Sequence, residues 1–166
     1  MKQAILFNFE VDKESNSIYV KRSFNAPIDL VWAAWTEADI LDKWWAPKPY
    51  QTKTKSMDFK EGGQRLYAMV GPNGEEHWAL ADYNSISPKT NFKYLDAFCD
   101  NSGKLNPDFP RSDWNVDFIE SNGVTTVYVT IKHEKLADLE MTIEMGFKEG
   151  FIMALENLDQ YIKDMI

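Results

Sequence analysis

Residues 143–162 read IEMGFKEGFIMALENLDQYI and carry the clearest periodic pattern in the chain. Apolar residues recur there at steps of three and four, while charged residues occupy the opposite side. This spacing predicts an amphipathic helix of about 20 residues, starting near residues 138–143, whose apolar side must pack on another element. The apolar positions are Ile143, Phe147, Phe151, Ala154, Leu155, Leu158 and Ile162.

Two glycines, Gly146 and Gly150, lie one turn apart within this predicted helix. Glycine in a helix interior costs about 1 kcal/mol relative to alanine, so a structural reason for both is expected. They either let a strand approach the helix closely or leave room for another molecule.

The surface that the helix covers is predicted by residues 52–134, where the pattern changes to the alternation typical of strands. Asn122-Gly123 between two strand-like runs is the strongest hairpin signal. Polar residues such as Lys93 and Asn115 point away from an apolar face, which predicts an antiparallel sheet covered on one side only. The apolar face contains Phe92, Tyr94, Phe98, Trp114, Val116, Phe118, Val127, Val129 and Ile131.

The N-terminal part of the chain adds two strands and two short helices. Residues 5–11 and 18–24 are predicted strands joined by a turn. Residues 27–35 begin with a proline and place apolar residues on one face, which predicts a helix. Thr36 with Asp39 resembles a capping box for a second short helix. The fold class predicted from the whole pattern is α+β.

Six short motifs, in this order over residues 18–163, resemble those of a known family. Each motif is common by itself, but the order is specific. They are Phe24-Asn25-Ala26-Pro27 with Val31-Trp32, Leu41 with Trp44-Trp45-Ala46-Pro47, Asp58 through Gly62-Gly63, Asn73-Gly74, Gly123-Val124-Thr125-Thr126, and Gly150-Phe151 with Leu155 and Leu158. With them the chain resembles homologues of the heat-shock-protein-90 ATPase activator, C-terminal domain type, within the START and birch-pollen-allergen-like (SRPBCC) superfamily.

The resemblance implies the helix-grip fold, a curved antiparallel sheet wrapped around a long C-terminal helix with two short helices after the first core strand. We expect one START-like domain over residues 1–166, with residues 1–17 adding a strand and a turn. The superfamily includes lipid carriers, hormone receptors and cyclases, so it implies a fold more strongly than an activity. It also implies a chaperone as a candidate partner, with stress response as the setting. The eukaryotic co-chaperone has a further N-terminal domain for which residues 1–17 are too short, so we expect weak or no stimulation of a chaperone ATPase.

Charge and cysteine content narrow the function classes. A net charge of −8 disfavours nucleic acid and anionic membranes as partners. The single cysteine, Cys99, excludes an internal disulfide and a cysteine-based zinc site. Residues 1–7 lack the apolar stretch of a signal peptide, and the longest apolar run, residues 30–35, is far shorter than a membrane span. We therefore expect a cytoplasmic monomer or homodimer.

Aromatic residues make up 14% of the chain, and such rings fill cores or line pockets. Core filling is the commoner role for any one tryptophan, yet the predicted apolar sheet face is larger than one helix can cover. We predict a cavity on the order of several hundred Å³ between sheet and helix, open near the short helices and residues 100–111, for a small hydrophobic or amphipathic molecule or a lipid. Its predicted lining is Trp45, Tyr67, Met69, Trp78, Tyr94, Asp96, Phe98, Trp114, Phe147 and Phe151.

Asp96 stands out because it lies between Tyr94 and Phe98 on the apolar face. A buried carboxylate there is costly without a partner; the candidate partners are Arg65, His77 and His133. Asp96 then either orients a polar ligand group or accepts a proton. The alternative, which we favour, is that the strand ends early and leaves Asp96 in water.

No catalytic constellation emerges from the sequence. His77 and His133 lie in separate predicted strands without metal-ligand spacing, and nucleophile-elbow and phosphate-loop motifs are missing. We predict no catalytic residue, no metal and no cofactor. Residues 100–111 form either a plain connection or a flap with Phe109 at its tip. A binding protein is therefore favoured over a co-chaperone module, and both over a cyclase or hydrolase that uses Asp96.

Overall fold

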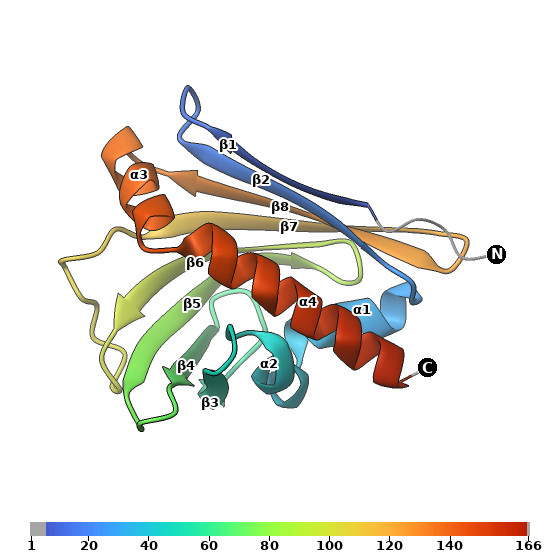
Figure 1. Cartoon of the computed structure of the whole chain (residues 1–166), viewed down its shortest axis with the longest axis horizontal. Coiled ribbons are helices and arrows are strands. Elements are labelled where there is room, and N and C mark those ends of the chain that lie inside the picture. Colours follow the sequence, from blue (N-terminus) through green and yellow to red (C-terminus); the bar gives the residue numbers. More distant parts are fainter. Residues whose placement is uncertain (1–5, 166) are drawn as a thin grey trace.

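The computed structural model describes residues 6–165 as one curved sheet with a long helix lying across one face (Figure 1). Ile5, assigned to the first strand from the sequence, lies outside the described residues. The strands are β1 (Phe7–Asp12), β2 (Ser17–Phe24), β3 (Gln51–Met57), β4 (Gln64–Val70), β5 (Glu76–Ser87), β6 (Asn91–Cys99), β7 (Ser112–Ser121) and β8 (Val124–His133). The helices are α1 (Ile28–Thr36), α2 (Ala38–Trp44), α3 (Leu136–Glu144) and α4 (Phe147–Met165).

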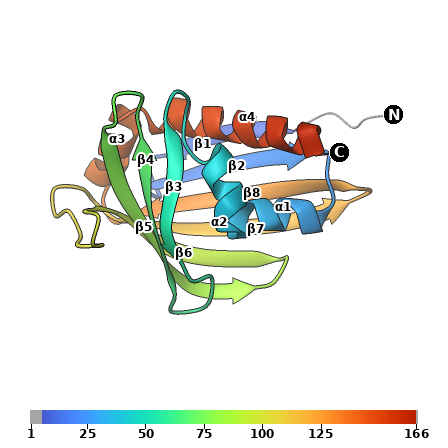
Figure 2. The ribbon, with the colours of Figure 1, turned by 90° about the horizontal axis from the view of Figure 1, so that it is seen from below.

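The eight strands form one antiparallel sheet in the order β1-β2-β8-β7-β6-β5-β4-β3. Figures 1 and 2 show the sheet curving around α4, with α1 and α2 beside the C-terminal half of that helix. The predicted α+β class and helix-grip fold are confirmed. Among the described residues, no helix combines the length and the hydrophobicity that crossing a membrane requires.

The β7–β8 hairpin forms where the sequence predicts it. Ser121 pairs with Val124 across the turn, and Asn122 and Gly123 have φ angles of 54° and 80°. Two-residue turns with positive φ at both positions match the twist of paired strands, and asparagine and glycine adopt that conformation most readily.

The apolar side of α4 covers the sheet as predicted. Phe151, Ala154, Leu155, Leu158 and Ile162 are all buried. Burying a large aliphatic side chain contributes roughly 1.5–3 kcal/mol. This row of residues is therefore a main source of the stability that holds the helix on the sheet.

The predicted helix start near residues 138–143 is wrong. α3 ends at Glu144 and α4 begins at Phe147, so two helices replace one. Gly146 lies between them with a φ of 87°, and its N–H donates to the Ile143 carbonyl oxygen at 3.1 Å. A left-handed glycine just after the last turn is a common helix stop, and Ile143 therefore belongs to α3.

The predicted capping box is also wrong. Thr36 is the last residue of α1, and its hydroxyl donates to the Trp32 carbonyl oxygen at 2.8 Å. Glu37 precedes α2 and makes no side-chain capping bond. The threonine is thus satisfied inside α1, by the back-bonding that Thr side chains make in helices.

Aromatic rings fill the space between α1, α2 and the sheet. Trp35 packs edge-on against Trp44 with ring centroids 4.9 Å apart, and Trp32 does so against Phe118 at 5.0 Å. The Trp44 indole N–H donates to the Ala34 carbonyl oxygen at 2.8 Å. We call this region, with Leu155, Leu158 and Ile162 of α4, the packed half.

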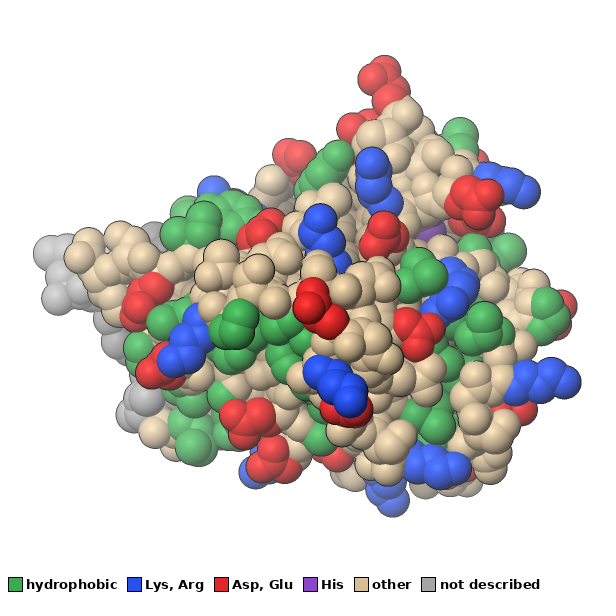
Figure 3. Space-filling model, turned by 180° about the vertical axis from the view of Figure 1, so that it is seen from behind, with side chains coloured by type: hydrophobic (Ala, Val, Ile, Leu, Met, Phe, Trp, Pro, Cys, Tyr) green, Lys and Arg blue, Asp and Glu red, His purple; other side chains and the backbone are tan. Residues whose placement is uncertain are grey.

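The molecule seen from behind, on the side away from α4, shows acidic and basic side chains interspersed among apolar ones (Figure 3). Lys21 lies over the Tyr128 ring at 5.5 Å, and Asn91 bonds to Asp117 at 2.7 Å. This outer face therefore carries polar pairs, and the apolar interior lies on the opposite, concave face beneath α4.

Candidate ligand-binding cavity

A cavity of about 250 Å³ lies between the sheet, α3 and the first turns of α4. Nine of the ten residues predicted to line it do so. They are Trp45, Tyr67, Met69, Tyr94, Asp96, Phe98, Trp114, Phe147 and Phe151. We call this region, with α3, the hollow half.

Trp78 was also predicted to line the cavity, and this is wrong. Ala79 lines the cavity from β5, and successive residues of a strand point to opposite faces. Trp78 instead packs beside Leu66 and Leu80 in a separate cluster, with the Lys55 ammonium 5.9 Å from its ring centroid.

The glycines around α4 leave space at the roof of the cavity. Gly146 and Gly150 both line it. A Cβ added at Gly150 would meet only the Pro47 ring, at 3.6 Å, which is an ordinary contact distance. Gly150 therefore supports the second of the two sequence interpretations, room for another molecule, rather than close approach of a strand.

The mouth of the cavity forms where two neighbouring strands separate. Pairing between β6 and β7 ends at Leu95 and Asp113, although β6 continues to Cys99. Residues 100–111 leave the sheet at this point, and Phe109 and Pro110 line the cavity. Phe109 packs on Phe98 with centroids 5.0 Å apart. The end of the long loop thus contributes to the cavity lining.

Aromatic rings form the walls. Tyr94 stacks on Trp114 at 5.3 Å, and Phe147 stacks on Phe151 at the same centroid distance. Trp45 lies 5.9 Å from Trp114, so the wall is continuous from the sheet to α2. Of the two adjacent tryptophans, Trp45 lines the cavity, whereas Trp44 lies in the packed half.

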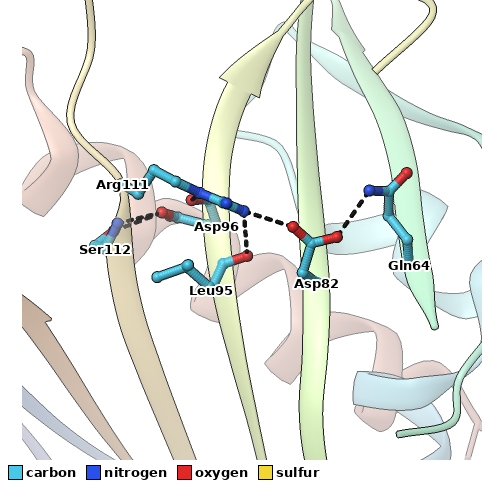
Figure 4. A network of polar contacts seen from close by, with 6 residues as sticks. All are labelled: Gln64, Asp82, Leu95, Asp96, Arg111 and Ser112. Atoms are coloured by element: carbon cyan, nitrogen blue, oxygen red, sulfur yellow. Dashed lines mark hydrogen bonds and ion pairs between the residues drawn. The ribbon is translucent and has the colours of Figure 1, made fainter. Parts of the chain in front are cut away.

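Asp96 is held inside the cavity wall by three donors. Its Oδ1 accepts hydrogen bonds from the Ser112 backbone N–H and the Ser112 hydroxyl, both at 2.7 Å, and its Oδ2 accepts one from the Trp114 indole at 2.9 Å. Figure 4 shows Ser112 reaching across the gap between β7 and β6. The favoured interpretation, a strand that ends early with Asp96 in water, is wrong. β6 continues to Cys99, and Ser112 and Trp114 donate hydrogen bonds to the carboxylate beyond the point where β6 and β7 stop pairing.

Burial in this apolar wall raises the pKa of Asp96, against the opposing effect of the Ser112 and Trp114 hydrogen bonds. The side chain is surrounded by protein but keeps some accessible surface, because it borders the cavity. Burial likewise raises the pKa values of Tyr67 and Tyr94, so both phenols stay neutral.

Arg111 secures the outer side of the same gap (Figure 4). Its Nε donates to the Asp96 carbonyl oxygen at 3.0 Å, and its Nη2 bonds to Asp82 Oδ2 at 2.6 Å. Gln64 donates to the other Asp82 oxygen at 2.7 Å. These side-chain bonds connect β4, β5 and β6 to the end of the loop. They hold the Asp96 backbone in place.

None of the three residues proposed as partners hydrogen-bonds to the Asp96 side chain or forms an ion pair with it. Arg65 is buried with its guanidinium 4.0 Å from the Tyr67 ring centroid, next to a void of about 20 Å³ that suits one water. His77 is exposed. His133 Nε2 lies 3.1 Å from the Thr142 hydroxyl. Its charge would lower the pKa of Asp96, while burial lowers the pKa of His133 itself.

The sequence interpretation missed the contribution of α3 and of the strand ends. Thr142 and Met145 come from the α3 segment, and Ser112 begins β7. Their presence depends on the helix break at Gly146 and on the loop geometry, so only the glycine itself was a usable signal. In the part of the chain that the structure describes, no three His, Cys, Asp or Glu residues gather as a metal site.

Comparison with known proteins finds one matching family and several similar solved structures. The family model "Activator of Hsp90 ATPase homolog 1-like protein" matches residues 25–163. Protein Ms6760 from Mycobacterium smegmatis superposes with a TM-score of 0.86 at 24% identity, covering 95% of this chain and 96% of that one. A protein from Arthrobacter aurescens gives 0.90 at 24%, covering 95% and 91%. One from Staphylococcus epidermidis gives 0.82 at 25%, covering 94% of each chain.

No curated protein matches the chain. The family model nevertheless spans most of the 166 residues, including α1, the whole sheet from β3 to β8 and nearly all of α4. The protein therefore belongs to the family of Activator of Hsp90 ATPase homolog 1-like proteins.

Proposed function

We propose that this protein binds a small amphipathic molecule in the cavity between α4 and the sheet. The observation that carries the proposal is a space of about 250 Å³, far larger than the void of about 20 Å³ beside Arg65. Protein interiors seldom leave voids larger than a water. A cavity of roughly 150 Å³ already admits benzene, so this volume suits a molecule with one or two rings better than a long-chain lipid.

The chemistry of the walls supports the same proposal. Ligand pockets are mostly apolar with a few fixed polar groups. Here Trp45, Trp114 and Phe151 supply apolar surface, and Asp96 and Tyr67 supply polar atoms. Tyr67 accepts a hydrogen bond from the Trp45 indole at 3.1 Å, which fixes both side chains before a ligand arrives and lowers the entropic cost of binding.

A fluorescence titration with the neutral, polarity-sensitive naphthalene dye prodan tests the proposal. The wild type should bind it, seen as a blue-shifted emission. Gly150→Leu places a side chain in the cavity and should abolish binding, whereas Gly150→Ala raises helix propensity without filling the space and should bind as the wild type does. A wild type that binds no dye, or a Gly150→Leu variant that binds it equally well, contradicts the proposal.

Contact with a chaperone ATPase is the second candidate, supported by the family that the chain matches. The expectation is weak or no stimulation by the purified protein. A several-fold rise in the rate of a purified Hsp90-type ATPase on addition of the protein would place this function first.

A further inference from the structure

The polar chemistry of the cavity points to one class of ligand, on the premise that the proposed function holds. Among the described residues that line the cavity, Asp96 is the only Asp, Glu, Lys, Arg or His. Lysine, arginine and histidine are all missing from that lining. An anionic ligand would therefore meet a carboxylate and no counter-charge.

The Asp96 carboxylate has an acceptor position to spare. A carboxylate offers about four acceptor sites. Three are filled, two on Oδ1 by Ser112 and one on Oδ2 by the Trp114 indole. Every one of these partners is a donor, so the group is held as an acceptor in a fixed orientation. The free site on Oδ2 can take one more N–H or O–H donor.

Among residues 6–165, Asp96 also forms no direct ion pair, and burial lowers the pKa of the nearby His133, which favours a neutral ring there. Arg111, the nearest arginine in sequence, bonds to its backbone oxygen and pairs with Asp82 instead. A buried charge costs free energy unless it is paired, and burial accordingly raises the pKa of the Asp96 carboxyl. A cation in the cavity would offset that cost.

The rings around Asp96 suit the same kind of ligand. Trp114 and Tyr94 stack with centroids 5.3 Å apart beside the carboxylate, and Trp45 lies 5.9 Å from Trp114. Aromatic faces attract ammonium groups, most strongly where water is excluded. The net charge of −8 favours the approach of a cation to the protein as a whole.

We propose that the cavity selects small apolar amines, whose ammonium group donates to Asp96 Oδ2 while the apolar body lies against Trp45, Trp114 and Phe151. A charge-assisted hydrogen bond contributes about 1.5–3 kcal/mol, which corresponds to roughly 10- to 150-fold in affinity.

Calorimetric titration of the wild type with three matched naphthalenes tests this inference. They are 2-(aminomethyl)naphthalene, 2-(hydroxymethyl)naphthalene and 2-naphthoate, which differ in charge but little in size. The amine should bind at least about tenfold more tightly than the alcohol, and the carboxylate most weakly. Equal or tighter binding of the alcohol overturns the amine selectivity and leaves the cavity proposal standing. Binding of none of the three overturns both.

Asp96→Asn then tests the residue. Its amide oxygen can still accept from Ser112, and the alcohol reports whether the variant keeps a folded cavity. The advantage of the amine over the alcohol should vanish, and measurable binding of the alcohol shows that the cavity is still folded. An amine advantage that survives in a variant that binds the alcohol excludes Asp96 as the partner. Should the variant bind no ligand, Ser112→Ala, which removes one donor and keeps the charge, should retain the amine preference; loss of that preference would contradict the inference.

Discussion

The two halves beneath α4 are built from similar residues and packed differently. In the packed half, Trp35 and Trp44 interlock and Leu158 has no exposed surface. In the hollow half, Trp45 and Trp114 also lie close together, yet a cavity of about 250 Å³ remains. Aromatic content alone therefore does not fill an interior; the side chain at each helix position facing the rings decides whether space is left.

The sharpest contrast is between two adjacent tryptophans. Trp44→Ala should lower the free energy of unfolding by about 3–5 kcal/mol, because the ring is almost fully buried and its indole is hydrogen-bonded. Trp45→Ala should cost clearly less, since one side of its ring already borders empty space. Urea unfolding of both variants measures the difference; equal losses would mean that the hollow half is as tightly packed as the other.

A second pair of substitutions adds volume instead of removing it. Ala154→Leu should cost about 1–3 kcal/mol, because Ala154 is buried in a packed region. Gly150→Leu should change the free energy of unfolding by less than about 1 kcal/mol, since the cavity accepts the side chain and the helix gains propensity. Thermal unfolding of the two variants compares them directly, and a larger loss for Gly150→Leu would contradict an open cavity.

The free energy of unfolding should also depend on pH through Asp96, with a sign that is unusual for an aspartate. Burial raises the pKa of Asp96 in the folded protein, so folding favours its protonated form. Stability from this group is therefore gained as pH falls through the raised folded pKa towards the unfolded value, and lost as pH rises. His133 on β8 opposes the shift, and the Tyr67 and Tyr94 phenols stay neutral across this range. Unfolding free energies of wild type and Asp96→Asn, measured from pH 7 to pH 4, should converge on the acid side; a gap that widens there contradicts this sign.

His133 should give the smallest effect, with the opposite sign. Burial lowers its pKa below the usual 6.5, so the folded protein favours the neutral ring. Its contribution is complete above the unfolded pKa and is lost as pH falls towards the folded one. Between pH 8 and pH 5 the melting temperature of wild type should fall more than that of His133→Gln, which keeps a donor for Thr142. Parallel curves would show that His133 does not titrate differently in the two states.

Periodicity predicted the elements well because it depends on positions a few residues apart. The stripe from Phe151 to Ile162 and the Asn122-Gly123 turn both follow from local rules. Trp78 was misplaced because strand parity depends on where a strand enters the sheet, and one residue reverses every side chain.

The environment of Asp96 could not be predicted in this way. It depends on β6 and β7 parting after Leu95, and on Ser112 returning across a loop of about a dozen residues to meet the carboxylate. The spacing of residues in the sequence does not show how close Ser112 and Asp96 lie in the fold. The glycines gave the right hint, but only the structure distinguishes room for a ligand from close approach of a strand.

The placement of the tryptophans has an optical consequence. Trp45 and Trp114 line the cavity, and Trp45 lies 5.8 Å from Trp35 and 5.2 Å from Trp44. Indole rings this close exchange excitation energy, so excitation absorbed in the packed half also reaches Trp45 at the cavity wall. A quencher that enters the cavity should lower the fluorescence of most of these tryptophans together. The intrinsic fluorescence of the protein would then report whether the cavity is occupied.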